Sequence, residues 1–183
     1  MLRIISLLIS ASMLFGCAEM PQVVPGAETI RGAQVLIDQG TLHLRSGELD
    51  RAGSEFRLAW DMAQLPAALD GLGAVMFRQG DYAAAEKLFL QAAQLDESYP
   101  EALANLALLY ETLGMKAKAG HYFQLALERG PANARARNNY AAYIVDNESG
   151  VISREKAKSE LYKAEAMMQH PIISANIHKV IED

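Results

Sequence analysis

Apolar and small residues recur along this chain at a nearly constant spacing. Three phenylalanines are each preceded nine residues earlier by a glycine and followed three residues later by an alanine. The three sets are Gly47, Phe56 and Ala59; Gly80, Phe89 and Ala92; and Gly114, Phe123 and Ala126. Glycine marks turns, and a period of 33 or 34 residues is typical of helical units that stack into a solenoid. The pattern therefore predicts pairs of helices joined by glycine turns.

Other positions in these segments resemble the tetratricopeptide repeat (TPR), a unit of two antiparallel helices, A and B. Leu72-Gly73 and Leu106-Ala107 match the pair in the middle of helix A, and Tyr110 and Pro131 match the later tyrosine and the terminal proline. The resemblance implies an all-α fold, a TPR α-solenoid of about four helical hairpins with a C-terminal capping helix. The first three repeats fall at about 33–65, 66–99 and 100–133. An unrelated helical bundle is the alternative.

A fourth unit at 134–171 follows with a longer turn and completes a predicted array over 27–171. Asn133 is expected to cap its helix A, and Ser153 its helix B, because both side chains can accept a hydrogen bond from a free backbone N–H.

The segment 172–183 predicts a capping helix with one apolar and one polar face. The apolar face is expected to contain Ile173, Ile177, Val180 and Ile181.

The N-terminus carries a different signal. Residues 1–16 contain a basic start and an apolar run of about twelve residues, too short for a bilayer that needs roughly twenty. The run ends in Leu14-Phe15-Gly16-Cys17, which resembles the bacterial lipobox and implies that Cys17 is acylated after residues 1–16 are removed. A plain secretory signal or a buried helix is the alternative. Residues 17–26 are expected to form the lipidated cysteine and a flexible tether, and Ala18, which is not Asp, favours the outer membrane over the inner.

Composition narrows the remaining functions. The formal charge of -5 and the lack of a basic stripe argue against nucleic-acid binding. No catalytic motif or phosphate-binding loop is found, and the four histidines are scattered. We therefore expect no enzyme, no metal and no cofactor.

In TPR proteins the A helices line a concave face that binds another protein. The matching positions here predict a partner-binding groove formed by Leu44, Arg45, Asp70, Phe77, Arg78, Asn105, Leu108, Glu111, Arg135 and Asn138. Leu44, Phe77 and Leu108 are expected at equivalent positions, as an apolar strip for an amphipathic or extended segment; the alternative is that they pack against their own B helices. The carboxylate-binding clamp of one TPR class is rejected, because of its five positions only Asn105 matches.

The segments 109–114 and 138–141 resemble the TPR lipoproteins of type IV pilus biogenesis and of tight-adherence pili. That resemblance implies a scaffold at the periplasmic face of the outer membrane, assisting assembly or localisation of a pilus or secretion complex, with a secretin as one candidate partner. An adaptor for cell-wall enzymes or for outer-membrane protein assembly is the alternative.

Overall fold

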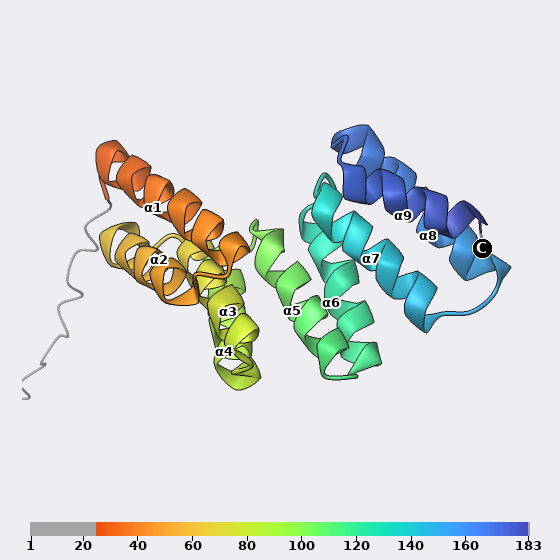
Figure 1. Cartoon of the computed structure of the whole chain (residues 1–183), viewed down its shortest axis with the longest axis horizontal. Helices are drawn as coiled ribbons and strands as arrows, with labels where there is room; N and C mark the ends of the chain where they lie inside the picture. Colours follow the sequence, from red (N-terminus) through yellow and green to blue (C-terminus); the bar gives the residue numbers. More distant parts are fainter. Residues whose placement is uncertain (1–24, 183) are drawn as a thin grey trace, which may run out of the picture.

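The computed structural model describes residues 25–182, which form helices joined by short turns (Figure 1). Four consecutive hairpins pair α1 with α2, α3 with α4, α5 with α6 and α7 with α8, and α9 packs on the last hairpin. The helices are α1 (Ala27–Ser46), α2 (Leu49–Ala63), α3 (Pro66–Gln79), α4 (Tyr82–Leu95), α5 (Pro100–Thr112), α6 (Lys116–Arg129), α7 (Ala134–Asn147), α8 (Val151–Met167) and α9 (Pro171–Glu182). The predicted all-α architecture of stacked hairpins with a C-terminal helix is confirmed.

The recurring glycines form the turns between helices A and B. Gly47, Gly80 and Gly114 have φ values of 83°, 84° and 71°, a left-handed conformation that only glycine adopts at little cost. In the first turn the N–H of Gly47 donates to the Leu44 carbonyl at 3.2 Å, and the N–H of Glu48 donates to the His43 carbonyl at 2.9 Å. These bonds satisfy the last carbonyls of helix A and reverse the chain. The glycine period in the sequence is thus the period of the turns.

The recurring phenylalanines fill the space within hairpins and, for Phe56, also the space between neighbouring hairpins. Phe56, Phe89 and Phe123 of the B helices are fully buried. A Cβ atom at Gly71 would lie 2.3 Å from the Phe56 ring, and one at Gly73 would lie 2.6 Å from the Phe89 ring. Because interiors are closely packed, the A helices need these small residues to let each ring approach. Phe56 therefore joins its own hairpin to the next one.

The hairpins follow a curve with the A helices inside. Each of α1, α3, α5 and α7 contacts the next A helix or α9, whereas among residues 25–182 no two B helices contact each other. Helices that approach one another line the inner side of a curved stack, and those that separate lie outside. The A helices therefore form a concave face, as the TPR resemblance implied.

The fourth hairpin confirms one predicted cap and corrects another. The Asn133 side chain accepts a hydrogen bond from the Ala136 N–H at 2.9 Å, so the predicted cap of α7 is confirmed. Helix α8 begins at Val151 after Gly150, and Ser153 lies inside it, donating to Glu148 instead of capping. The Ser153 prediction was wrong because Gly150, with φ 113°, redirects the chain earlier.

Helix α9 covers the end of the solenoid. Ile173, Ile177 and Val180 are buried, but Ile181 is 49% exposed. Ile181 directly follows Val180, and a step of one residue turns the side chain about 100° around a helix. The apolar face of α9 is therefore narrower than predicted.

Candidate functional site: the concave face

The predicted groove residues differ greatly in exposure. Arg45, Arg78 and Arg135 are exposed. Asp70 and Asn138 are buried. The half-buried members are Leu44, Phe77, Asn105, Leu108 and Glu111. The arginines are therefore the members of the set that are open to a partner without any movement of the chain.

The apolar strip does not have the register that was predicted. The carbonyls of Leu44, Phe77 and Glu111 all accept the N–H of the following turn glycine. Glu111, and not Leu108, is thus the equivalent residue in the third hairpin, and the predicted equivalence of Leu108 was wrong. Leu108 lies six residues before Gly114, one helical turn earlier than Leu44 and Phe77 lie before their own turn glycines. Leu44, Phe77 and Leu108 all pack partly against the core, so little of the strip is available for a partner.

Asp70 lies at the junction of the second and third hairpins, where it is 9% exposed. Its carboxylate accepts a hydrogen bond from the Asn105 amide at 2.8 Å and one from the Tyr99 hydroxyl at 3.1 Å. Burial raises the pKa of Asp70 to about 6, although both hydrogen bonds act in the opposite direction. Asp70 and Asn105 therefore bind each other across the junction.

Asn138 and Glu111 also make contacts between hairpins. The Asn138 side-chain oxygen accepts from the Asn176 amide of α9 at 2.8 Å. Glu111 accepts from the Asn147 amide at 3.3 Å, and burial, together with the charge of Asp146, raises its pKa. These polar side chains help to fix how consecutive A helices stack.

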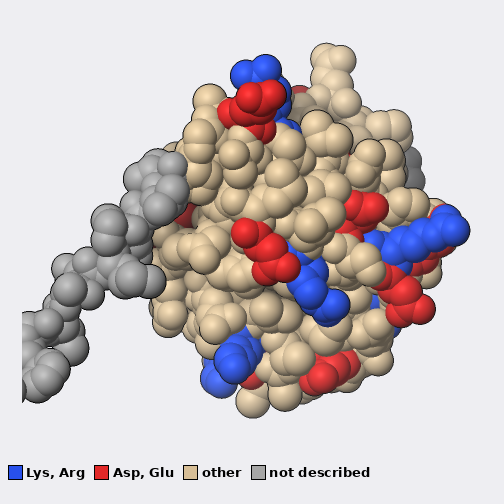
Figure 2. Space-filling model, turned by 90° about the vertical axis from the view of Figure 1, so that its left-hand side faces the viewer, with Lys and Arg blue, Asp and Glu red and all other residues tan. Residues whose placement is uncertain are grey.

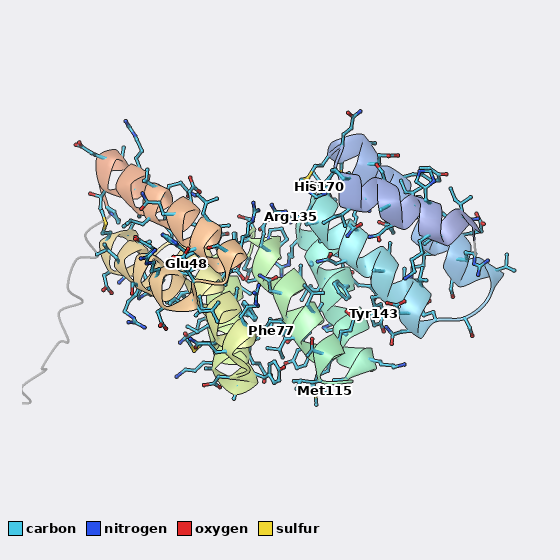
Figure 3. The ribbon with its side chains drawn as sticks, in the orientation of Figure 1. Glu48, Phe77, Met115, Arg135, Tyr143 and His170 are labelled. Atoms are coloured by element: carbon cyan, nitrogen blue, oxygen red, sulfur yellow. The ribbon has the colours of Figure 1, made fainter. Side chains whose placement is uncertain are left out.

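Residues of the first and fourth hairpins, together with residues at the start of α9, line one cavity of about 440 Å³, called here the basic cavity. Figure 3 shows Arg135, at the start of α7, beside His170, just before α9. The lining residues used below are Arg45, Arg135, Asn139, Met168, His170 and Ile172. Nothing in the repeat pattern marks Met168 or His170, because they line the cavity only through the curvature of the whole array.

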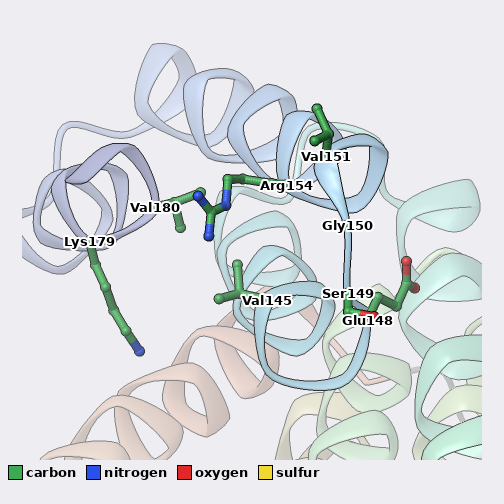
Figure 4. A pocket seen from close by; sticks show the side chains of 8 residues that line it. All are labelled: Val145, Glu148, Ser149, Gly150, Val151, Arg154, Lys179 and Val180. Carbon is green, nitrogen blue, oxygen red and sulfur yellow. The ribbon is translucent and has the colours of Figure 1, made fainter. Parts of the chain in front are cut away.

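A second cavity, of about 590 Å³, lies outside the concave face, between the α7–α8 turn and α9 (Figure 4). Its wall combines the apolar Val145 and Val180 with the acidic Glu148 and the basic Arg154 and Lys179. This mixture of charges favours no single ligand class.

Two further kinds of feature concern residues 25–182, a metal site and a membrane-spanning helix. No three His, Cys, Asp or Glu side chains there are grouped so that they could hold a metal ion. No helix of that part of the chain combines the length and apolarity needed to cross a membrane. The predicted signal peptide and the predicted lipidation site, Cys17, lie outside the described residues.

Comparisons with known proteins agree with this geometry. Two family models match: "TPR repeat" over residues 72–114 and "Tetratricopeptide repeat" over residues 100–133. Curated proteins yield no match.

Several solved structures, two of them named as TPR structures, resemble the chain in fold. A thermophilic TPR protein of Thermus thermophilus, TTC0263, superimposes with a TM-score of 0.68 at 19% identity, covering 81% of this chain and 80% of its own. MamA superimposes with a TM-score of 0.54 at 20% identity, covering 74% and 77%. The first TPR domain of Spaghetti (RPAP3), bound to the HSP90 peptide SRMEEVD, has a TM-score of 0.55 at 22% identity, covering 69% and 99%.

Residues 72–133 match TPR repeat models, and the described part of the chain has the fold of a TPR solenoid. TPR repeats indicate a scaffold for protein–protein interaction, and the fold is typically non-catalytic.

Proposed function

We propose that this protein is a lipid-anchored scaffold that binds a segment of a partner protein along its concave face. The observation that carries this proposal is the exposure of Arg45, Arg78 and Arg135 on helices that line the inner side of the curve. Arginine is enriched at the energetically important positions of protein interfaces, because it combines charge, several donors and a long apolar stem. Among the solved relatives, Spaghetti (RPAP3) is named as bound to an HSP90 peptide.

The anchor is proposed from the sequence. Residues 14–17 resemble a lipobox, and more than one acyl chain on Cys17 would give stable membrane attachment. Ala18 favours the outer membrane, and the resemblance of 109–114 and 138–141 to pilus lipoproteins favours the assembly or localisation of a pilus or secretion complex.

Photocrosslinking tests the concave face. A photoreactive amino acid replaces Arg78 in the full chain, and a matched control replaces Arg57, which is exposed on the B helix α2. We expect a partner to be crosslinked in cells from position 78 and not from position 57. Equal crosslinking from both positions, or none from position 78, would contradict binding at the concave face.

The anchor and the process need separate tests. Globomycin, or Cys17→Ser, should leave a precursor that retains residues 1–16 and is lost from the outer-membrane fraction. Deletion of the protein should reduce the assembled secretin in that fraction. Normal maturation under globomycin would reject the lipobox, and unchanged secretin assembly would reject the pilus or secretion role.

A further inference from the structure

The basic cavity joins cationic side chains from two distant parts of the chain. Arg45 is in the last turn of α1 and Arg135 in the first turn of α7, yet both line the same space. Among the side chains of residues 25–181, no carboxylate lies within 4.0 Å of either guanidinium. The two charges therefore lack close ion-pair partners in the part of the chain that the structure describes.

The neighbouring polar groups add further donors. The Ile172 N–H donates to Nδ1 of His170 at 3.2 Å, so a neutral His170 ring carries its proton on Nε2 and can donate it. The side-chain oxygen of Asn139 accepts from Asn138, which leaves the Asn139 amide free to donate. A nearby acid, Glu101, lines the adjoining cavity with Arg135 and accepts a hydrogen bond from Asn133 at 3.0 Å.

Apolar side chains border the same cavity. Met168 and Ile172 both line it and are exposed. A small free anion would use only the donors, whereas a peptide can place a carboxylate on the donors and an apolar neighbour on Met168 and Ile172. The net charge of -5 opposes a long polyanion. The combination fits a short segment with few acidic and some apolar side chains.

We propose that the basic cavity binds an Asp or Glu carboxylate in an amphipathic acidic segment of the partner. This inference rests on the proposed function, in which the concave face binds that partner. Arg45 and Arg135 would each form a charge-assisted hydrogen bond to the carboxylate. Because they come from the first and fourth hairpins, the bound segment would connect the two ends of the curve.

The test uses the full chain and a fluorescein-labelled peptide of alternating leucine and glutamate, with fluorescence anisotropy as the measurement. Arg45→Glu and Arg135→Glu are each expected to weaken binding about tenfold or more, as for the loss of a charged hydrogen bond. Arg57→Glu is the matched control, because it changes the net charge equally at an exposed site away from the cavity. A peptide with lysine in place of glutamate should bind the Arg135→Glu variant better than the original chain.

The outcomes separate this inference from the proposed function. Equal weakening by Arg57→Glu, or equal binding when glutamine replaces glutamate in the peptide, would overturn the carboxylate site. Melting curves followed by circular dichroism should be the same for all three variants, since the three arginines are exposed; an unfolded variant is replaced by the corresponding Arg→Gln change. If the partner still crosslinks from position 78 in the Arg45→Glu and Arg135→Glu variants, the carboxylate site is wrong and the scaffold function remains. If the original chain gives no crosslink there, the scaffold function itself fails.

Discussion

At the scale of single residues, the buried carboxyl group of Asp70 connects two repeats, but its charged form lowers the stability of the fold. Its pKa is raised from an ordinary 3.8 to about 6, mainly because burial disfavours the charged form. The folded state therefore binds the proton more tightly than the unfolded state, and the stability due to this proton is present below pH 3.8 and lost as the pH rises through about 6. Charged Asp70 destabilises the fold at neutral pH.

We expect the free energy of unfolding to increase by about 1 kcal/mol between pH 7 and pH 5 because of this residue. Urea denaturation at several pH values measures the change, and Asp70→Asn should remove it while leaving the hairpins folded. The range stops at pH 5 because Glu160 and Glu48, whose pKa values are lowered, lose their contribution at more acidic pH. The same pH dependence in Asp70→Asn would assign the effect to other groups.

At the scale of helices, a glycine is needed where its helix approaches an aromatic ring closely, but not where it has room for a Cβ atom. A Cβ atom added at Gly71 would lie 2.3 Å from the buried Phe56 ring. A Cβ atom added at Gly53 would lie 3.7 Å from Val75, which is an ordinary contact distance. Gly71→Ala should therefore destabilise the protein by about 1–3 kcal/mol, because the ring cannot move in a closely packed core. Gly53→Ala should stabilise it by about 0.5–1 kcal/mol through its better helix propensity. Thermal melts of both variants test the pair, and a similar loss in each would mean that packing against Phe56 is unimportant.

The sequence predicted these helices well because each signal was local. Gly47 and Gly80 mark turns by their own conformation, and Phe56 and Phe89 recur because each hairpin repeats the same packing. The site was harder to predict. Arg45 and Arg135 could be placed on the concave face from the TPR register, but their convergence with His170 depends on the curvature accumulated over several repeats.

At the scale of the whole molecule, apolar side chains are buried to different extents along the length of the solenoid. Of three apolar clusters among the described residues, the two larger ones extend from Ala85 to Val180 and from Ala33 to Val75, and the latter serves the first two hairpins. Helix α1 has no preceding hairpin among the described residues. Val35 and Leu42 of α1 are 51% and 64% exposed. In α5 the residue equivalent to Leu42 is Leu109, five residues before the turn glycine, and it is fully buried. Figure 2 shows this N-terminal end as a largely uncharged surface with scattered charges.

In a linear array each repeat is stabilised mainly by its neighbours, and local opening begins where buried apolar contacts are fewest. We therefore expect amide hydrogen exchange to be fastest in α1 and α2 and slowest in the helices α3 to α6, whose hairpins have a hairpin on either side. The C-terminal hairpin should be intermediate in exchange rate, because Ile173, Ile177 and Val180 of α9 cover it.

Ile177→Asp would remove part of the cover that α9 provides, and it should speed exchange in α7 and α8 while changing exchange in α1 and α2 little. Mass-spectrometric exchange measures both patterns. Uniform exchange along the chain would show that the array opens as one cooperative unit, and the two apolar clusters would then not act as separate sources of stability.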